Sequence, residues 1–432
     1  MDLNKIIEIT DGQILNEFKN KIIHNIVTDS RKVKKNDLFI ALRGERYNGH
    51  DFINDIKKAS GIIIDEELEI KTKIPVIKVN STQESLYQIG KYYRDKLDIP
   101  LIAITGSNGK TTTKELISYI LESKYNVLNN KENYNNLIGV SNTLFHLKDS
   151  HDIIVMELGM NHRGEIEKLA HMCSPNLGII TNIGLSHLKY LKSRRNIFKA
   201  KMELTNYLKG DLIVNGDDKY LKKVKHSFKC GRNYDNDLIA YNIYHNQDLI
   251  EFSIFLDKEY RIRFNNPSLH FINNILIAIK TCLLFDIDIK TIIKRINDFE
   301  MVNNRMKITK KKNITLIDDS YNANYESVKA GLETLKEIPN NKMIILGDML
   351  ELGKYSFYYH YKINFILNKI YHKEVLTVGK YTKHIKGKHF MNNRELINYL
   401  KQKKLDNYYI YIKGSHGMHL EEIANWINKM IL

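Results

Sequence analysis

The sequence predicts an α/β protein built on parallel sheets with helices on both faces. Apolar runs that are too short for helices recur along the chain, and segments with helical periodicity lie between them. Many of these runs end in Gly, Asp or Ser, as strands do where they lead into loops. A chain of 432 residues is too long for one ordinary core, so we expect three domains in series.

Residues 1–92 form the first predicted domain, a small mixed α/β unit at the N-terminus. Short apolar runs alternate here with polar turns, as in FIALRG (39–44), GIIID (61–65) and IPVIKVN (74–80). This alternation is typical of short strands joined by loops.

Residues 93–303 form the predicted central domain, which begins with the buried-strand pattern PLIAITG at 100–106. The segment KELISYILESK that follows has helical periodicity. Further strands are expected in DIIVMELG (152–159), NLGIITNIG (176–184) and DLIVNGD (211–217). Strands that alternate with helices in this way predict a parallel sheet covered on both faces.

Residues 304–432 form the third predicted domain, in which the alternation of strands and helices starts again. Its expected strands lie in ITLIDDSYNAN (314–324), KMIILGDML (342–350), EVLTVG (374–379) and YYIYIKGS (408–415). We predict a Rossmann-like, doubly wound unit of ordinary domain size.

The net charge of +16, from 66 Lys and Arg against 50 Asp and Glu, raises the question of a nucleic-acid partner. No basic run is longer than KKK at 310–312, and we find no interleaving of aromatic and basic residues of the kind that stacks bases. We therefore expect no nucleic-acid binding and attribute the charge to a composition rich in Lys, Asn, Ile and Tyr.

No apolar run reaches the eighteen residues of a membrane span, and the start, MDLNKIIEITDGQ, lacks the apolar core of a signal peptide. We therefore expect a cytoplasmic protein without a membrane partner. We also expect a monomer. The cysteines Cys173, Cys230 and Cys282 show no metal-ligand spacing, and we expect them to stay reduced.

The segment TGSNGKTTTK follows the first strand of the central domain and predicts a P-loop-type phosphate site. Gly109, Lys110 and Thr111 match the end of the pattern G-x-x-x-x-G-K-[ST], but its first glycine is displaced to Gly106. Two glycines let the backbone approach phosphate, and a helix that begins near Lys110 points its positive end at the anion. Lys110 can neutralise β- and γ-phosphates, and the Thr111 hydroxyl can reach Mg²⁺.

Three further polar residues stand near the ends of expected elements. Glu157 ends an apolar strand, where a buried carboxylate must be paired or bind a metal such as Mg²⁺. His187 follows another strand, and Lys201 lies in a helical stretch. A single histidine or lysine is more often structural than functional, so these residue types alone leave both interpretations open.

Taken together, four segments resemble, in order, the central domain of the Mur ligases. They are TGSNGKTTTKE, MELGMNHRGEI, NIGLSHL and the AKME that contains Lys201. Mur ligases are ATP-dependent enzymes that form amide bonds in peptidoglycan precursor synthesis, and they have the same shortened phosphate loop. The resemblance implies that residues 93–303 bind ATP.

Other segments extend the resemblance along the chain. TDSRKVKKNDLFIALRGERYNGHDFI (28–53) is similar to the domain that binds UDP-muramyl-peptide in this family. IDDSYNAN, LGDMLELG and IKGSHGM are most similar to the member that joins D-alanyl-D-alanine to UDP-N-acetylmuramoyl-tripeptide. The alternative is the member that adds a diamino acid to UDP-N-acetylmuramoyl-dipeptide, because it shares the ATP site.

The resemblance also implies roles for individual residues, position by position. ATP would be held by Thr105, Gly106, Ser107, Asn108, Gly109, Lys110, Thr111 and Thr112, with Asn274 at the adenine, Arg305 at the γ-phosphate and Asp319 at the ribose. Two Mg²⁺ ions would be bound by Thr111, Glu157 and His187, and by a carbamate on Lys201. Catalysis would depend on Lys110, Glu157, His187 and Lys201. The substrates would contact Ser30, Arg31, Asn135, Asn136, Asn322 and Asn324.

The chain departs from the family pattern at several positions. His416 stands where KGSRGM has arginine, and a neutral histidine would hold an anion only weakly. Asn304 precedes Arg305 in place of a frequent glycine. Because the expected ATP contacts come from two domains, we also expect the third domain to close over nucleotide bound to the second.

Overall fold

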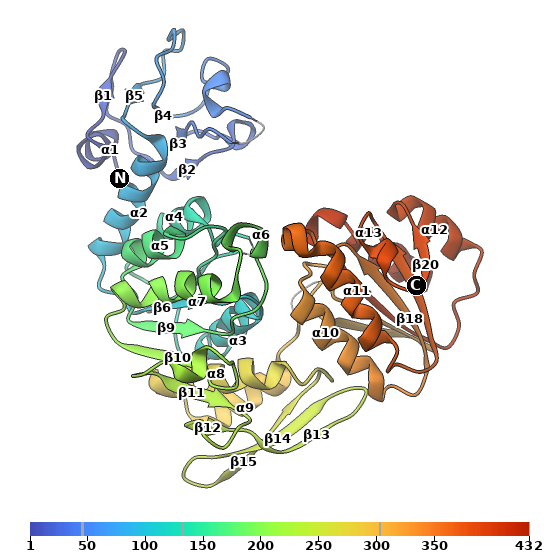
Figure 1. The fold of residues 1–432 in the computed structure, drawn as a ribbon. Helices are drawn as coiled ribbons and strands as arrows, with labels where there is room; N and C mark the ends of the chain where they lie inside the picture. Colours follow the sequence, from blue (N-terminus) through green and yellow to red (C-terminus); the bar gives the residue numbers. More distant parts are fainter. Residues whose placement is uncertain (45–46, 132, 302–303, 432) are drawn as a thin grey trace.

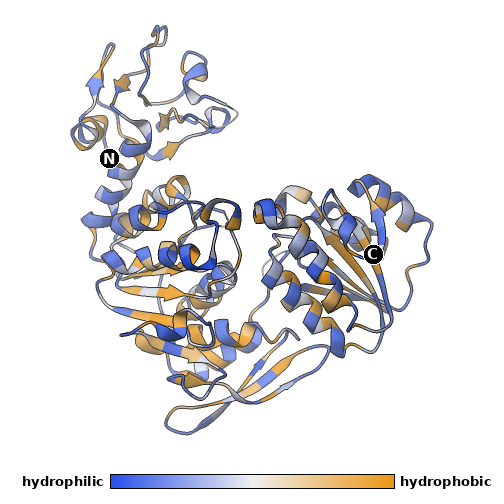
Figure 2. Cartoon of the chain, viewed as in Figure 1, coloured by the Kyte–Doolittle hydropathy of each residue, from blue (hydrophilic) through white to orange (hydrophobic). Residues whose placement is uncertain are grey.

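The computed structural model describes residues 1–44, 47–131, 133–301 and 304–431. Figure 1 shows three α/β units in chain order, with the N-terminal unit above the central one and the C-terminal unit beside it. In Figure 2 the hydrophobic colour gathers on the strands inside the units and the hydrophilic colour on the outer helical faces and loops. No helix in the described ranges is both long enough and apolar enough to cross a bilayer.

The first sheet has the strand order β1-β5-β4-β3-β2, with β2 to β5 parallel and β1 antiparallel to β5. Its strands are β1 (Gln13–Ile14), β2 (Asn25–Val27), β3 (Asp37–Ile40), β4 (Gly61–Ile64) and β5 (Val76–Lys78). Successive side chains of a strand point to opposite faces, so Ile63 packs with α1 (Leu3–Thr10) and α2 (Thr82–Lys96), while Ile62 and Ile64 pack on the other side.

The central sheet is entirely parallel, as predicted, in the order β12-β11-β10-β9-β6-β8-β7. Its strands are β6 (Leu101–Thr105), β7 (Val127–Asn129), β8 (Ile153–Glu157), β9 (Leu177–Ile180), β10 (Asp211–Asn215), β11 (Phe228–Gly231) and β12 (Leu238–Ile239). The surrounding helices are α3 (Lys110–Leu121), α4 (Leu137–Leu144), α5 (Glu165–Cys173), α6 (Leu188–Leu191), α7 (Arg194–Met202), α8 (Phe271–Leu284) and α9 (Ile289–Asp298).

Both faces of the central sheet are buried in hydrophobic cores. Ile102 and Ile104 of β6 pack into the core formed with α3, α8 and α9, whereas Leu101 and Ala103 pack into the core of α4, α5 and α7. The direction of the strand order reverses at β6, and such a switch point opens a crevice at the carboxyl ends of the strands. The predicted phosphate loop leaves β6 at this place.

An antiparallel three-stranded sheet extends below the central and C-terminal units in Figure 1, and the sequence analysis did not predict it. It consists of β13 (Tyr241–His245), β14 (Ile250–Phe255) and β15 (Glu259–Phe264). Ile250, Phe252 and Ile254 alternate with Glu251, Ser253 and Phe255 and pack into the central core. This period of two was the available signal.

The C-terminal sheet has the order β16-β17-β21-β18-β19-β20, and only β16 is antiparallel to its neighbour. Its strands are β16 (Lys307–Lys311), β17 (Ile314–Asp318), β18 (Asn341–Gly347), β19 (Lys373–Val378), β20 (Lys388–Phe390) and β21 (Tyr408–Lys413). Helices α10 (Tyr325–Thr334) and α11 (Ser356–Leu367) cover one face, and α12 (Asn393–Lys401) and α13 (Glu421–Ile431) cover the other. The doubly wound prediction is confirmed.

Short 3₁₀ helices complete the described elements. They are η1 (Ser30–Lys32), η2 (Gly49–Phe52), η3 (Glu203–Tyr207), η4 (Leu221–Lys223), η5 (Leu335–Glu337), η6 (Leu350–Tyr355), η7 (Thr382–His384) and η8 (His416–Met418). The domain limits stay a prediction: the limit after residue 92 falls within α2, and residue 303 lies outside the described residues. The three cysteines are buried and unpaired.

Gly331 provides a test of how α10 packs on the C-terminal sheet. A Cβ atom at this position would lie 1.8 Å from the hydroxyl oxygen of Tyr411, a fully buried residue of β21. We expect Gly331→Ala to lower the free energy of unfolding by about 1–3 kcal/mol, because a packed core resists added volume. Urea denaturation measures the change. Lys329→Ala, at an exposed position of the same helix, is the control and should change stability by less than about 0.5 kcal/mol.

Candidate active site

The glycines of the phosphate loop are required by close backbone contacts. Gly106 has φ +150°, and a Cβ atom there would lie 1.9 Å from the hydroxyl oxygen of Thr181. Gly109 has φ +79°, and a Cβ atom there would lie 2.9 Å from the side-chain amide of Asn274. Both glycines therefore let the loop pack against neighbouring polar groups where any larger residue would collide.

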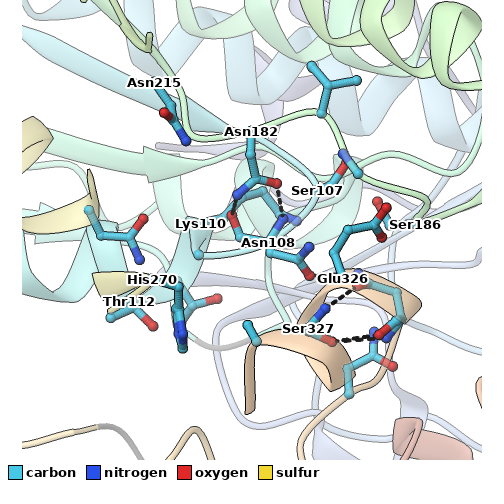
Figure 3. Close-up of a pocket in the computed structure, with 18 of the residues that line it drawn as sticks. Ser107, Asn108, Lys110, Thr112, Asn182, Ser186, Asn215, His270, Glu326 and Ser327 are labelled. Atoms are coloured by element: carbon cyan, nitrogen blue, oxygen red, sulfur yellow. Dashed lines mark hydrogen bonds between the residues drawn. The ribbon is translucent and has the colours of Figure 1, made fainter. Parts of the chain in front are cut away.

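Asn182, which follows β9, holds the loop in place (Figure 3). Its side chain accepts a hydrogen bond from the Asn108 amide at 3.0 Å and donates one to the Asn108 carbonyl at 2.9 Å. The Thr181 hydroxyl donates to the same carbonyl at 2.6 Å. The loop is thus preorganised, and α3 starts at Lys110 with first-turn N–H groups that have no partner within the helix. Such N–H groups bind phosphate.

Two lysine side chains meet at the carbonyl oxygen of Gly106. Lys110 Nζ and Lys201 Nζ each donate to it at 2.8 Å, although the two residues lie in different helices. Burial lowers the pKa of Lys110. Burial, reinforced by the Lys110 cation, lowers the pKa of Lys201 well below its ordinary value. The base of the loop therefore concentrates cationic groups where an anion would relieve their repulsion.

Glu157, the last residue of β8, faces these lysines. Its carboxylate accepts hydrogen bonds from the Thr111 hydroxyl at 2.6 Å and from the Asn135 amide at 2.8 Å. Burial alone would raise the pKa of Glu157, but the Lys110 cation and the Thr111 hydrogen bond lower it below its ordinary value. Glu157 is therefore an ionised carboxylate, 5% exposed, with the hydroxyl of Thr111 beside it.

His187 caps the start of α6 with φ 58°, next to the same cations. Burial lowers the pKa of His187 to about 4, against the opposing attraction of Glu351, and Lys110 and Lys201 act in the same direction as burial. The imidazole is therefore neutral near pH 7 and has a nitrogen lone pair available for a metal.

The expected nucleotide contacts come from the central and C-terminal units. Asn274 of α8 packs against Gly109. The Arg305 guanidinium lies over the Tyr321 ring at 3.6 Å, and its buried Nε has no hydrogen-bond partner among the described residues. Asp319 accepts from Lys413 Nζ at 2.6 Å and from the Tyr411 hydroxyl at 3.1 Å.

One cavity of about 660 Å³ collects most of the predicted site residues. Those on its wall are Ser107, Asn108, Gly109, Lys110, Thr111, Thr112, Asn135, Asn136, Glu157, His187, Asn274, Arg305, Asp319, Asn322 and Asn324. Lys201 lies beneath the wall, 1% exposed, with Thr105 and Gly106 at the foot of the loop.

Ser30 and Arg31 do not lie in this cavity. They line a second one of about 770 Å³, at the carboxyl ends of the first sheet's strands. Asn136, Gly159 and Asn161 line both cavities, so the two adjoin.

Comparisons with known proteins find matches to one family along the chain. The family models described as "Mur ligase family, catalytic domain", "Mur ligase middle domain" and "Mur ligase, glutamate ligase domain" match residues 22–94, 104–282 and 304–425. The UDP-N-acetylmuramoyl-tripeptide--D-alanyl-D-alanine ligase of Buchnera aphidicola subsp. Baizongia pistaciae is 34% identical over 89% of this chain and 87% of its own. The chain belongs to the Mur ligase family.

Two further proteins extend the comparison of this Mur ligase. The Rickettsia prowazekii enzyme with the same name is 35% identical over 89% of this chain and 91% of its own. A crystal structure of MurF from Acinetobacter baumannii superimposes with a TM-score of 0.90 at 27% identity, covering 99% of this chain and 98% of its own. The three-unit α/β architecture is therefore that of a known Mur ligase structure.

The sequence analysis missed two carboxylates by which the C-terminal unit of this Mur ligase contacts the turn before α6. Glu326 of α10 accepts from the Leu185 amide at 3.0 Å, and Arg194 pairs with its other oxygen. Glu351 of η6 accepts from the His187 amide at 2.9 Å. LGDMLELG contains Glu351, and Glu326 follows SYNANY, but only the fold shows that both reach the same turn.

Asn324 makes a further contact between the two units, and its amide donates to the Asn108 side chain at 2.6 Å. Lys413, from IKGSHGM, was also unassigned by the sequence analysis, and it donates to Asp319 and to the Asn322 carbonyl. His416 is exposed, and its ring lies 5.8 Å from that of Tyr321. Asn108 of the phosphate loop thus contacts a side chain of the C-terminal unit directly.

The two carboxylates predict a measurable coupling between the units. In Glu326→Ala the Leu185 amide loses a charged acceptor and Arg194 loses its partner. Such hydrogen bonds contribute about 1.5–3 kcal/mol, so we expect the amides of segment 183–188 to exchange with solvent about 10- to 100-fold faster. Hydrogen exchange with mass spectrometry measures this. Glu333→Ala is the control, because Glu333 pairs only with Lys329 and Lys336 of its own segment among the described residues. Unchanged exchange in Glu326→Ala would contradict the coupling.

Proposed function

We propose that this Mur ligase joins D-alanyl-D-alanine to UDP-N-acetylmuramoyl-tripeptide and hydrolyses ATP to ADP and phosphate in doing so. The observation that carries the proposal is the meeting of Lys110, Glu157, His187 and Lys201 at one phosphate loop, beside the carboxylates of the C-terminal unit. The Buchnera and Rickettsia relatives bear the name of this ligase, which supports the same substrate pair.

The two adjoining cavities suit a long substrate. In our proposal the UDP group occupies the cavity lined by Ser30 and Arg31, and the peptide passes Asn136 toward Glu157. Its terminal carboxylate then meets the γ-phosphate of ATP, whose phosphates lie on the loop from Thr105 to Thr112. Asn274, Arg305 and Asp319 would hold the adenine, the γ-phosphate and the ribose. Asn135, Asn322 and Asn324 would contact the peptide substrates.

The chemistry requires two anions to approach each other. A carboxylate is a poor acyl donor, so one of its oxygens attacks the γ-phosphorus of ATP, ADP leaves, and an acyl phosphate forms. The dipeptide amine then attacks the acyl carbon, and the tetrahedral intermediate expels phosphate and loses a proton to give the amide. Lys110 and Arg305 reduce the repulsion between carboxylate and phosphate in the first step.

The residues present fit Mg²⁺. Glu157 is an ionised carboxylate beside the Thr111 hydroxyl, and His187 is neutral, so oxygen and imidazole donors are ready without loss of a proton. In our proposal Thr111 holds one ion with the ATP phosphates, and Glu157 and His187 hold a second. When bound, the ions neutralise charge on the phosphate and carboxylate oxygens.

We also propose that Lys201 carries a carbamate. An unmodified Lys201 places a second ammonium beside Lys110 on the Gly106 carbonyl, and no carboxylate pairs with it among the described residues. The Lys201 ammonium loses one proton to give the neutral amine, a form that burial favours. The amine then adds carbon dioxide and loses a second proton, so that a carbamate anion replaces the cation. The carbamate oxygens would be additional ligands for Mg²⁺.

The substrate assignment can be tested against its nearest alternative, the ligase that adds a diamino acid to UDP-N-acetylmuramoyl-dipeptide. Purified enzyme with MgATP and UDP-muramyl-tripeptide should release phosphate at least tenfold faster with D-alanyl-D-alanine than with free D-alanine or a diamino acid. Mass spectrometry should find the pentapeptide product. Release that depends instead on UDP-muramyl-dipeptide with a diamino acid would establish the alternative.

The Lys201 proposal has a separate test. We expect Lys201→Ala to lower kcat at least 100-fold, because a charge that stabilises the reacting groups is lost. Short carboxylates such as acetate should restore part of this activity in Lys201→Ala but not in Lys110→Ala. With ¹³C-labelled bicarbonate, the wild type should show a carbamate resonance that Lys201→Ala lacks. A fully active Lys201→Ala enzyme would refute the proposal.

A further inference from the structure

A cluster of lysines lies at the amino ends of the first sheet's strands, opposite the edge where Ser30 and Arg31 lie. The cluster lines a hollow of about 780 Å³ and consists of Lys21, Lys34, Lys35, Lys57, Lys58 and Lys73. All six side chains are exposed. In the described part of residues 1–92, five lysines form ion pairs, but these six and Lys19 form none. No acidic residue lines the hollow.

The topology of the sheet gathers these lysines. Because β2, β3, β4 and β5 run parallel, their amino ends meet at one edge. Lysines of the hollow fall in each of the four segments that lead into these strands. The cluster therefore comes from four separate segments of the sequence, and no continuous run of basic residues predicts it.

Composition alone does not explain the cluster. Residues 1–92 contain fifteen Lys and Arg and fourteen Asp and Glu, so this part of the chain is nearly neutral. Four of its acids stand at the other edge of the sheet, where Asp29 follows β2 and Asp65, Glu66 and Glu67 follow β4. At the amino edge, Asp37 begins β3, but its carboxylate is buried and accepts a hydrogen bond from the Lys34 amide. The separation of charge leaves a local positive field over the hollow that attracts anions.

The lining residues indicate which anion fits. Lysine ammonium groups are compact point charges that bind phosphate oxygens, whereas the planar arginine fork that selects carboxylates is absent from this lining. No aromatic ring lines the hollow, so a nucleobase would find no stacking partner. Val33 and Ile74 supply apolar surface between the lysines.

We propose that this hollow binds a phosphate-rich anion, supplied either as a free polyphosphate chain or as the headgroups of an anionic lipid surface. The site is separate from the proposed ligase site, which occupies the carboxyl edges of the sheets. The phosphate loop itself would bind polyphosphate, so the test uses full-length enzyme saturated with a non-hydrolysable MgATP analogue. Tripolyphosphate is titrated by calorimetry, and vesicles with or without phosphatidylglycerol are sedimented with the enzyme.

The decisive variant combines Lys34→Gln, Lys35→Gln, Lys57→Gln and Lys58→Gln. The matched control removes the same charge from exposed lysines of the C-terminal unit, as Lys383→Gln, Lys386→Gln, Lys401→Gln and Lys404→Gln. We expect the wild type and the control to bind one of the two probes, and the hollow variant to bind it at least tenfold more weakly. Binding should weaken as KCl rises from 50 to 200 mM.

The probe that binds identifies the source of the phosphate groups. Ligase activity without added anion should stay within twofold of wild type in both variants, because neither changes the proposed active site. If the wild type binds neither tripolyphosphate nor anionic vesicles, or if both variants lose binding equally, the proposal is overturned.

Discussion

Two lysine side chains on one carbonyl oxygen are the constraint on which the active site depends. Lys110 and Lys201 both donate to Gly106, and this is possible only because the loop turns sharply at two glycines and packs on Thr181. So much positive charge in a partly buried place is unfavourable unless anions come near. Glu157 supplies one anion, and the triphosphate of ATP is the natural second. The site is therefore built to be completed by its substrate.

The same excess of positive charge explains why the C-terminal unit contributes carboxylates to this site. Glu351 lies beside His187, and its charge partly offsets the effect of the two lysines on that histidine. Glu326 accepts from the same turn and pairs with Arg194. The turn that carries His187, the histidine that we propose as a metal ligand, is thus positioned by the C-terminal unit. We therefore expect nucleotide binding, closure and metal binding to depend on one another.

The sequence was sufficient for features that are contiguous in the chain. The strand, glycine turn and helix around Gly106 follow each other directly, and their apolar and glycine patterns predict the loop without knowledge of the fold. The contacts of Glu326 and Glu351 join residues more than 130 positions apart, and no local pattern encodes such a distance. The strands β14 and β15 do alternate, but β13 does not, because Asn242, Ile243 and Tyr244 are all exposed, and this irregular strand makes the sheet hard to recognise.

The two edges of each sheet differ in the roles of the polar groups that they carry. The carboxyl edges hold the groups that face the two cavities, as parallel sheets generally do. At the amino edge of the central sheet the loops bind each other: Asn176 accepts from the Leu101 amide at 3.0 Å, and the Lys209 amide donates to Pro175 at 2.8 Å. An edge whose polar groups are satisfied in this way has a structural role. The amino edge of the first sheet differs, because its lysines are exposed and form no ion pair among the described residues, and mutual repulsion among them opposes folding. The external anion that we propose for this hollow would reduce that repulsion.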